Sequence, residues 1–414
     1  MNDGQRTFLF LQGPISPFFE RVAAEILEHA PTARILRSNL CYGDRLYWRR
    51  PGAVDYRGSL KKWPAFIDEF IEREGVTDIL LLGEQRDYHL AAAAAAERHG
   101  AKVIATDFGY LRPDWIAFEF DGLTGASRFP RDPVAIRRIA AASPEPDLTA
   151  WFRDAFWAQS RPDIVYHMAA SLLWFLYPGY KSHQPNHPIV TYLGTGLRLL
   201  AQGRRARNAN EMIAAAEQHP GGAFVFPLQI ARDFSIRAYS RFPDLETPIR
   251  EVVASFAKHA AADAQLVLKI HPLDPGLISW KRIALKEARR HGIEERVKYI
   301  DGGDLGRLIR AASGVVVVNS TVGLMSLRQG APTLALGQAI YDVPGMTAQC
   351  GLDEFWQAPP KPDEDLVRDF VRAIAGSIMV RGTFYSEPGL TTAVEGATVR
   401  LLEQSVNQPR MAAE

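Results

Sequence analysis

Short apolar runs alternate with amphipathic segments along most of this chain. In the first third, strand-like runs occupy 7–12, 32–36, 77–83 and 101–106, and helical patterns occupy 18–30, 59–75 and 87–99. Gly75 and Gly100 stand where two of these helices are expected to end, because glycine suits the left-handed turn after a helix. Apolar strands separated by helices predict parallel βαβ units with both faces of the sheet covered.

A second series of such units begins near residue 222. Strands are expected at 222–229, 264–270, 314–319 and 332–336, and helices at about 245–262 and 279–291, whereas about 130–220 is helix-rich. This rhythm predicts an α/β protein with two Rossmann-like domains and a cleft between them. We place the first domain, with its helical insertion, at 1–185, the second at 186–385, and a C-terminal helix and tail at 386–414.

Composition excludes several classes of protein. The formal charge of +1 does not indicate a nucleic-acid partner. Two cysteines, Cys41 and Cys350, are too few for a disulfide framework and fit a reducing compartment. The sequence begins without a signal-peptide pattern and contains no run of 18 apolar residues, so we expect a cytoplasmic protein with no membrane span. Such a protein can still associate with a membrane surface.

Polar residues follow several of the predicted strands. They are Gln12 with Gly13, Asp107, Gln229 with Asp233, His271 with Pro272, and Asn319 with Ser320 and Thr321. In open α/β sheets, ligands bind beyond the carboxyl ends of the strands. These residues are therefore the candidates for chemistry.

The stretch VVVVNSTVGLMSLRQG, residues 315–330, contains the most suggestive of these strand ends. A helix that begins at Ser320, Thr321 and Gly323 offers backbone N–H groups and hydroxyls to a phosphate. The alternative is an ordinary helix N-cap, which contributes about 1 kcal/mol. A Walker lysine and a GxGxxG pattern are both missing from this stretch, so the usual markers of ATP or NAD binding are lacking.

Three further residues have both a chemical and an ordinary interpretation. His271 follows a strand directly, and it either donates to a phosphate or makes a structural hydrogen bond. Asp233 is a candidate nucleophile or base, or else a surface loop residue. With Asp107 it provides the two carboxylates that sugar transfer with retention requires, provided that the two meet across the cleft.

Arginines and aromatic residues suggest what the ligands are. Arg86, Arg112, Arg232 and Arg237 offer charge to an anionic ligand, although each has a solvated alternative. The apolar segment 172–180 is followed by a basic segment that includes Arg198, Arg204, Arg205 and Arg207. Together these segments fit a lipid groove near an anionic membrane, or else a buried aromatic core with a solvated basic face, and we favour the core because aromatic helices are usually buried.

Seven stretches together carry a resemblance to a known family. They are FLFLQGPISPFF (8–19), RSNLCYGDRLYW (37–48), GEQRDYH (83–89), FGYLRPDWIAFE (108–119), FPLQIARDFSIRAYSRF (226–242), KIHPLDPG (269–276) and NSTVGLMSLRQGAPTLALGQAIYDVPGMT (319–347). In this order they resemble the capsular polysaccharide biosynthesis proteins of the KpsS type, which are bacterial β-Kdo glycosyltransferases. The resemblance covers about residues 8 to 356.

This resemblance implies a GT-B-like fold and a retaining β-Kdo transferase. The donor implied is CMP-β-Kdo, bound mainly by the C-terminal domain, and the acceptor is a phosphatidylglycerol-type lipid on the inner membrane face. Asp233 matches the nucleophile, Asp107 the acid/base, and His271, Ser320 and Thr321 the phosphate contacts. No metal or other cofactor is implied, and other capsule biosynthesis and export proteins are the further partners.

The sequence departs from the family pattern at two positions. Asp107 is followed by Phe108, where the family usually has two acidic residues, and Pro275 replaces a basic residue of the HPxDRG motif.

Two other functions are compatible with the same residues. One is a sugar-nucleotide epimerase of similar fold, and the other is a non-catalytic adaptor for capsule export.

Overall fold

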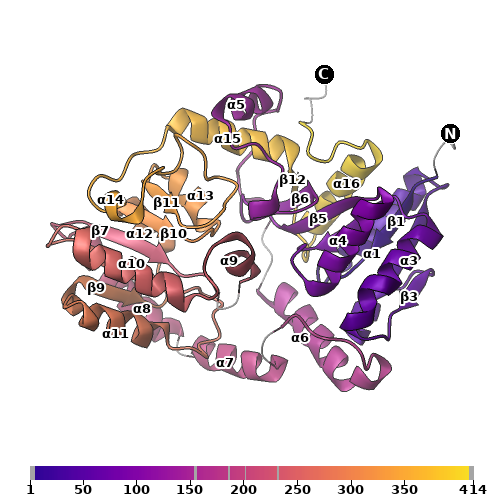
Figure 1. Cartoon of the computed structure of the whole chain (residues 1–414), viewed down its shortest axis with the longest axis horizontal. Helices are drawn as coiled ribbons and strands as arrows, with labels where there is room; N and C mark the ends of the chain where they lie inside the picture. The colour runs from indigo at the N-terminus through magenta and orange to yellow at the C-terminus, as the bar shows by residue number, and fades with distance from the viewer. Residues whose placement is uncertain (1–4, 153–155, 185–186, 201, 231–232, 410–414) are drawn as a thin grey trace. The chain divides into compact units, whose positions relative to one another are not determined.

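The chain forms two compact α/β units. The computed structural model describes all 414 residues except 1–4, 153–155, 185–186, 201, 231–232 and 410–414 (Figure 1). The first unit comprises Met1–Phe129, Arg138–Pro188 and Val371–Glu414, and the second comprises Pro130–Arg137 and Ile189–Phe370. The predicted fold class, with two Rossmann-like α/β parts, is confirmed. The predicted boundary at 185/186 lies outside the described residues, and the cleft stays a prediction.

A seven-stranded sheet forms the centre of the first unit, in the order β12-β6-β5-β4-β1-β2-β3. Its strands are β1 (Thr7–Phe10), β2 (Arg34–Asn39), β3 (Ala53–Asp55), β4 (Asp78–Leu82), β5 (Lys102–Phe108), β6 (Trp115–Phe120) and β12 (Met379–Arg381). Strands β3, β2, β1, β4 and β5 are parallel, so their carboxyl ends meet at one edge. The sequence had predicted only parallel pairing, whereas β6 runs antiparallel to both β5 and β12.

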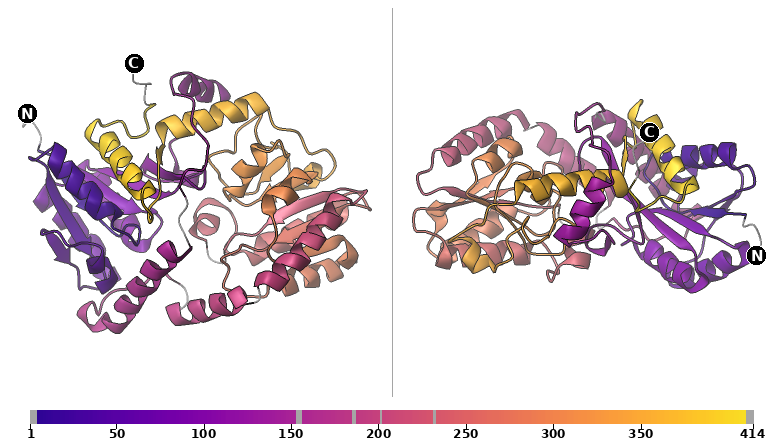
Figure 2. Two further views of the ribbon diagram at one scale, coloured as in Figure 1. Left: turned by 180° about the vertical axis from the view of Figure 1, so that it is seen from behind. Right: turned by 90° about the horizontal axis from the view of Figure 1, so that it is seen from above.

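Helices cover both faces of this sheet. The helices are α1 (Phe18–His29), α2 (Tyr42–Leu46), α3 (Trp63–Glu74), α4 (Asp87–His99), α6 (Phe156–Leu172) and α16 (Gly389–Leu402), with 3-10 turns η1 (Leu60–Lys62), η2 (Thr124–Ala126) and η3 (Trp174–Leu176). Helices α1 and α16 pack together on one face, and α3 and α4 lie on the other (Figure 2). Gly75 and Gly100 end α3 and α4 in the left-handed conformation, as the sequence predicted.

The second unit contains a five-stranded parallel sheet in the order β11-β10-β7-β8-β9. Its strands are β7 (Ala223–Pro227), β8 (Gln265–Lys269), β9 (Val297–Ile300), β10 (Gly314–Val317) and β11 (Thr333–Ala335). Its helices are α7 (Pro188–Leu200), α8 (Gln202–Glu217), α9 (Phe234–Tyr239), α10 (Glu246–His259), α11 (Trp280–Arg290), α12 (Leu305–Arg310), α13 (Val322–Leu327) and α14 (Leu352–Phe355), with η4 (Glu294–Arg296). Helices α5 (Pro133–Ala141) and α15 (Glu364–Ser377) each contain residues of both units.

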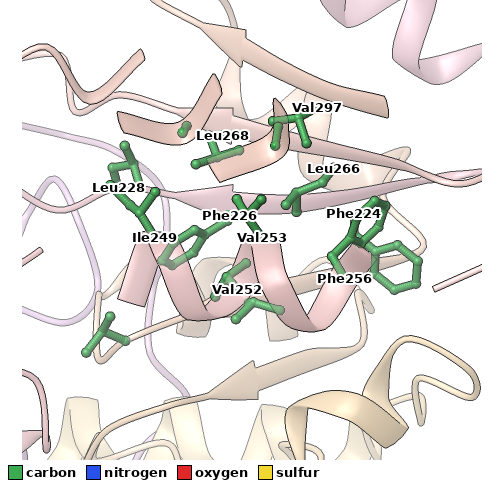
Figure 3. Close-up of a cluster of buried hydrophobic side chains, with 14 of the residues drawn as sticks. Phe224, Phe226, Leu228, Ile249, Val252, Val253, Phe256, Leu266, Leu268 and Val297 are labelled. Atoms are coloured by element: carbon green, nitrogen blue, oxygen red, sulfur yellow. The ribbon is translucent and has the colours of Figure 1, made fainter. Parts of the chain in front are cut away.

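One face of this second sheet packs against α10. Alternate residues of β7, among them Phe224 and Phe226, point toward Val252 and Phe256 of the helix (Figure 3). All four side chains are buried, and burial of a large apolar side chain stabilises the fold by about 1.5–3 kcal/mol. This packing fixes β7 between β8 and β10, and it therefore fixes the polar residues that follow these three strands.

Candidate functional site

The carboxyl ends of β7, β8 and β10 bring the predicted residues of the second unit to one sheet edge. Gln229 follows β7, His271 follows β8 and Asn319 follows β10, and these three strands are neighbours in the sheet. The Gln229 side-chain amide donates to Asn319 Oδ1 at 3.1 Å, and its oxygen accepts from the Asn319 backbone N–H at 3.3 Å. Both residues are buried. The sequence therefore identified residues that belong to one hydrogen-bonded group.

Asp233 is joined to this group by the same glutamine. Gln229 Nε2 donates to Asp233 Oδ2 at 3.0 Å, and the Ser235 backbone N–H donates to Asp233 Oδ1 at 3.0 Å. The second bond makes Asp233 the N-cap of α9, so part of its role is structural. Asn319 Nδ2 donates to the Ser235 carbonyl at 2.7 Å and ties α9 to the end of β10. The carboxylate is thus held in a single orientation by Gln229 at the end of β7 and by the first turn of α9.

His271 is oriented by its own loop. The Leu273 backbone N–H donates to His271 Nδ1 at 3.1 Å, so in the neutral ring the proton is on Nε2. Asp274 stabilises the same loop, because its carboxylate accepts from the Gly276 N–H and from the Trp280 indole at 2.8 and 3.0 Å. The loop is therefore built without the basic residue that Pro275 replaces. Pro272 is exposed beside the histidine.

The turn at 319–321 caps a short helix. Ser320 Oγ accepts from the Val322 N–H at 3.2 Å, and Tyr341 donates its hydroxyl to the Ser320 carbonyl. Helix α13 has only six residues, so its dipole is small. Gly323 has a packing role, because a Cβ there would lie 2.3 Å from the Tyr341 hydroxyl. Thr321 is the N-cap residue of α13 but makes no side-chain capping bond, so of these two residues only Ser320 supplies a hydroxyl contact to the start of the helix, and phosphate binding stays a prediction.

The arginines of the second unit have different environments. Arg237 is exposed, with its guanidinium carbon 5.3 Å from the Phe234 ring centroid. Arg198 and Arg205 both bind the Asp301 carboxylate, at 2.8 and 2.9 Å. The guanidinium groups of these two arginines are therefore paired within the protein, so they form no solvated basic face and are not available to membrane headgroups. Arg232 lies outside the described residues, as does the side chain of Arg204.

Gln12 of the first unit belongs to a buried polar network that the sequence did not reveal. Its amide nitrogen donates to the Tyr166 hydroxyl at 2.9 Å, and it lies 3.3 Å from both Asp44 carboxylate oxygens. Tyr166 donates to Asp44 Oδ1 at 2.8 Å, and Arg37 lies 3.6 Å from the same oxygen. All four side chains are buried. Residues 32–36 were predicted as the strand, so its true polar end at 37–39 was missed.

A small polar pocket opens beside this network. Its lining residues are Gly13, Pro14, Ser16, Phe19, Arg37, Asp44, Tyr47 and Tyr166. Packing requires a glycine at position 13, because a Cβ there would lie 2.3 Å from the Phe19 ring. The Asp44 carboxylate also accepts from the Leu40 and Cys41 N–H groups. The Arg37 guanidinium donates to Asn39 Oδ1 at 3.1 Å and to the Leu11 carbonyl, so both Arg37 and Asp44 are committed to structural bonds, and the pocket offers polar groups only on a small scale.

Arg86 and His89 stand at the next strand end. Arg86 precedes α4, and the described residues give it no ion pair with a carboxylate. His89 Nδ1 donates to the Gly83 carbonyl at 2.7 Å, whereas its buried Nε2 has no hydrogen-bond partner among the described residues. Burial and the neighbouring Arg86 lower the pKa of His89 to about 3, so the ring is neutral. A guanidinium without a carboxylate partner, beside a neutral histidine, is suited to an anionic ligand.

Asp107 lies near the end of β5 in the first unit. Its Oδ1 accepts from the Phe108 N–H at 2.7 Å, and its side chain is half-buried. Arg112 is exposed, with its guanidinium carbon 5.2 Å from the Phe108 ring centroid. Asp107 and Asp233 belong to different units. Their meeting across a cleft stays a prediction.

Glu119 is a second acidic group of the first unit. It lies on β6 with no exposed surface, accepts from the Tyr110 hydroxyl at 2.7 Å, and accepts from Ser127. Burial, aided by Glu84, raises the pKa of Glu119 to about 8. At neutral pH this side chain is therefore mostly protonated. In the sequence it is the last residue of the stretch FGYLRPDWIAFE (108–119), which does not reveal its partners.

The aromatic segment 172–180 differs from the prediction. The favoured interpretation is a buried core, yet Leu172, Trp174 and Phe175 are exposed, whereas Tyr177 is buried.

The described residues contain no helix that is long and apolar enough to cross a membrane. They also contain no cluster of three or more His, Cys, Asp or Glu side chains arranged to hold a metal ion.

The two units define an α/β protein whose polar groups gather at the carboxyl edges of its two sheets, where such folds bind ligands. Over residues 77–385 the chain matches the model of the family described as "Capsule polysaccharide biosynthesis protein", and it belongs to this family. The resemblance noted in the sequence is therefore confirmed.

Named relatives agree with this assignment. The chain is 29% identical over 394 residues to the capsule polysaccharide modification protein LipB of Neisseria meningitidis serogroup A, covering 93% of each chain. It is 29% identical to the capsule polysaccharide export protein KpsS of Escherichia coli, covering 92% of this chain and 97% of that one. Among solved structures, the β-Kdo 2,7 transferase of Thermosulfurimonas dismutans KpsC aligns over 96% of this chain and 99% of that chain, with 13% identity and a TM-score of 0.44.

Proposed function

We propose that this capsule biosynthesis protein is a retaining glycosyltransferase that moves β-Kdo from CMP-β-Kdo to a phosphatidylglycerol-type lipid. The observation that carries the proposal is the group formed by Gln229, Asp233 and Asn319 at one sheet edge, with His271 after the adjacent strand. A carboxylate held by two donors in one orientation is suited to attack on a bound sugar. Membership of the capsule family supports a sugar substrate.

The proposed reaction is a double displacement. The Asp233 carboxylate attacks the anomeric carbon of the donor, and the bond to the CMP phosphate oxygen breaks with its electron pair leaving on the phosphate. The acceptor hydroxyl then gives its proton to Asp107 while its oxygen attacks the same carbon. The bond to Asp233 breaks, which restores the carboxylate, and two inversions give net retention.

Departure of CMP requires stabilisation of negative charge on its phosphate. His271 carries its neutral-ring proton on Nε2, which makes this nitrogen the donor toward a phosphate oxygen. Ser320 and Thr321 would add hydroxyl and backbone donors, while Gln229 and Asn319 would orient Asp233. Because CMP is already a stable leaving group, the proposed chemistry requires no metal.

Charged side chains of the first unit would bind the anionic groups of the substrates. Arg86 and Arg112 offer guanidinium groups, and a planar guanidinium fits a carboxylate or phosphate. Gly13 lines the polar pocket, which would take a hydroxyl of the acceptor, and Gln12 would orient the pocket's Tyr166 hydroxyl. Arg237 and Pro272 would border the donor in the second unit. The lipid acceptor would bring the protein to the inner membrane face, together with other capsule proteins.

The decisive test replaces Asp233 without removing its structural role. Asn caps a helix as well as Asp does, but its NH2 group would replace the oxygen that accepts from Gln229, so Asp233→Asn should lower the free energy of unfolding by about 1–2 kcal/mol. It should nevertheless lower transfer from CMP-Kdo at least about a thousandfold and abolish the covalent sugar adduct seen by intact-protein mass spectrometry. The matched control is Asp304→Asn, because Asp304 caps α12 of the same unit by accepting from the Arg307 N–H at 3.1 Å.

The outcomes separate the competing functions. Full activity in Asp233→Asn would remove Asp233 from the mechanism. Isomerisation of the nucleotide sugar without transfer would indicate the epimerase. Polymer attachment that survives in the variant, with no turnover of any nucleotide sugar by the wild-type protein, would indicate the export adaptor.

A further inference from the structure

Helix α6 has apolar side chains on the face that it does not pack against the first unit. Its inner face carries the buried Tyr166, which binds Asp44 of α2. Its outer face carries Trp157, Val165 and Leu172, which are 58%, 53% and 66% exposed. These residues are eight and seven positions apart, so at 3.6 residues per turn they lie within an arc of about 80° and form one stripe.

The 3-10 turn η3 extends this stripe. Trp174 and Phe175 are 63% and 59% exposed, immediately after the end of α6. We call the five residues Trp157, Val165, Leu172, Trp174 and Phe175 the apolar face; the course of α6 can be followed in Figure 1. Three exposed aromatic side chains and two exposed aliphatic ones in one segment are unusual on a protein surface in water, and contiguous apolar surface marks an interaction site.

Basic side chains border the apolar face. The turn that follows η3 packs on the segment that precedes η1, because Tyr177 donates to Asp55 at 2.7 Å and a Cβ on Gly179 would lie 2.2 Å from the Gly58 carbonyl oxygen. Lys61 and Lys62 come directly after this contact and are exposed. Among the described residues, neither lysine forms an ion pair with a carboxylate. Arg161, on α6 itself, lies 5.9 Å from the Trp157 ring centroid.

The charges of this border favour an anionic partner. Residues 49–62 contain Arg49, Arg50, Arg57, Lys61 and Lys62 but only one acidic residue, Asp55. The Asp55 carboxylate is already occupied by Asn39, Tyr177 and Arg45. The border is therefore strongly positive, although the whole chain has a formal charge of only +1. A second copy of this chain would place like charges opposite each other.

We propose that the apolar face and its basic border form a docking surface for an anionic lipid bilayer. Trp and Phe side chains enter the boundary between headgroups and acyl chains, while lysines and arginines bind anionic headgroups. The helix lies on the membrane and does not span it. The link from docking to catalysis rests on the proposed lipid acceptor, but docking itself requires neither donor nor acceptor.

The test measures binding of the full-length protein to vesicles. Wild-type protein should co-sediment with vesicles of phosphatidylcholine and phosphatidylglycerol at low salt, and much less with phosphatidylcholine alone or at high salt. Trp174→Ala with Phe175→Ala should lower the partition coefficient at least about tenfold. Lys61→Glu with Lys62→Glu should lower it by at least about 30-fold, because two attractive charges are lost and two repulsive ones are added, and the remaining binding should lose part of its salt dependence.

The controls use exposed residues of other helices. Leu90→Ala removes an exposed leucine of α4, and Lys281→Glu with Lys286→Glu reverses two exposed lysines of α11. Both controls should bind vesicles as the wild type does. Thermal melting should be unchanged in all variants, because the replaced side chains are exposed.

Three outcomes would overturn the proposal. They are wild-type protein that fails to bind anionic vesicles, apolar-face variants that bind as well as the wild type, and a concentration-dependent dimer that the same variants abolish. Transfer to a short-chain, water-soluble acceptor tests the enzyme separately. Failure of that transfer with intact vesicle binding refutes the proposed function alone, whereas intact transfer without vesicle binding refutes the docking surface alone.

Discussion

Glu119 is an acidic residue whose protonation is coupled to the fold. The folded protein holds a proton on this carboxyl up to about pH 8, whereas the ordinary pKa of Glu is 4.5. The folded state therefore binds more protons than the unfolded state between these two values. The contribution to stability is fully present below pH 4.5 and is lost as pH rises toward 8.

We predict that Glu119→Gln weakens this pH dependence. The amide is uncharged, keeps the size of the protonated acid, and can bond to the hydroxyls of Tyr110 and Ser127. The free energy of unfolding by urea should fall less between about pH 5 and pH 8 in the variant than in the wild type. Glu97→Gln, at an exposed position of α4, should retain the wild-type slope. Equal slopes in both variants would contradict the buried-acid assignment.

The sequence predicted individual site residues more successfully than it predicted the residues to which they are hydrogen-bonded. Gln229, Asp233 and Asn319 were identified because each closely follows an apolar strand, and the structure joins them by hydrogen bonds. Gln12 was identified in the same way, but its partner Tyr166 is 154 residues away. Nothing in the local pattern connects two residues so distant along the chain, because their contact depends on how α6 packs on α2.

Elements with a complete local pattern were the ones predicted best. Helix α4 occupies the predicted residues 87–99, because its alanine-rich pattern ends at a glycine that must adopt positive φ. Strands β6 and β12 were missed. β12 has only three residues, and its pairing with β6 brings together segments more than 250 residues apart. Short strands of this kind depend on the sheet that they join rather than on their own sequence.

Helix α6 and the turn η3 that follows it show why burial was predicted wrongly for Leu172, Trp174 and Phe175 of the aromatic segment. Apolar residues occur on both sides of this helix, with Tyr166 on the packed side and Trp157 and Val165 on the exposed side. A helix that is apolar all round is normally buried in a soluble protein. The expectation of a core was therefore reasonable from the pattern alone, and it fails here because no described part of the chain covers the outer face.

For α13 we predict that Gly323 is required for packing. In Gly323→Ala the new methyl group would meet the Tyr341 hydroxyl at 2.3 Å, and Tyr341 is fully enclosed and cannot move freely. The variant should lower the free energy of unfolding by about 1–3 kcal/mol, measured by urea denaturation. Movement of Tyr341 would also disturb its bond to the Ser320 carbonyl.

A second helical glycine provides the matched control. A Cβ on Gly196 in α7 would meet no atom of another part of the described chain within 4 Å, so Gly196→Ala should stabilise the protein by up to about 1 kcal/mol. Opposite signs for the two substitutions are the expected result. A stable Gly323→Ala variant that loses only donor binding would instead assign the glycine to phosphate contact.

For the whole molecule, the central question is how two units share one reaction. Asp233 belongs to the second unit and Asp107 to the first. In the proposed mechanism, formation of the sugar adduct requires Asp233, whereas transfer of the sugar to the acceptor also requires a base. The two half-reactions should therefore be separable by substitution in one unit at a time.

We predict that Asp107→Asn stops the reaction after its first half. The Asn side-chain oxygen can still accept from the Phe108 N–H, as Asp107 Oδ1 does at 2.7 Å, so the local fold should persist. With CMP-Kdo and acceptor present, the variant should release one CMP per protein in a single burst and accumulate the adduct on Asp233. Rapid-quench CMP measurements and intact-protein mass spectrometry report these two quantities.

An exposed aspartate of the same unit provides the control for Asp107→Asn. Asp87→Asn, at an exposed position of the same unit, should turn over as the wild type does, because its carboxylate lies 4.0 Å from Lys181 on the surface. Steady turnover in Asp107→Asn would show that another group accepts the proton. Absence of both burst and adduct would mean that Asp107 is needed before the acceptor reacts, and the assignment of one unit to each half-reaction would then be wrong.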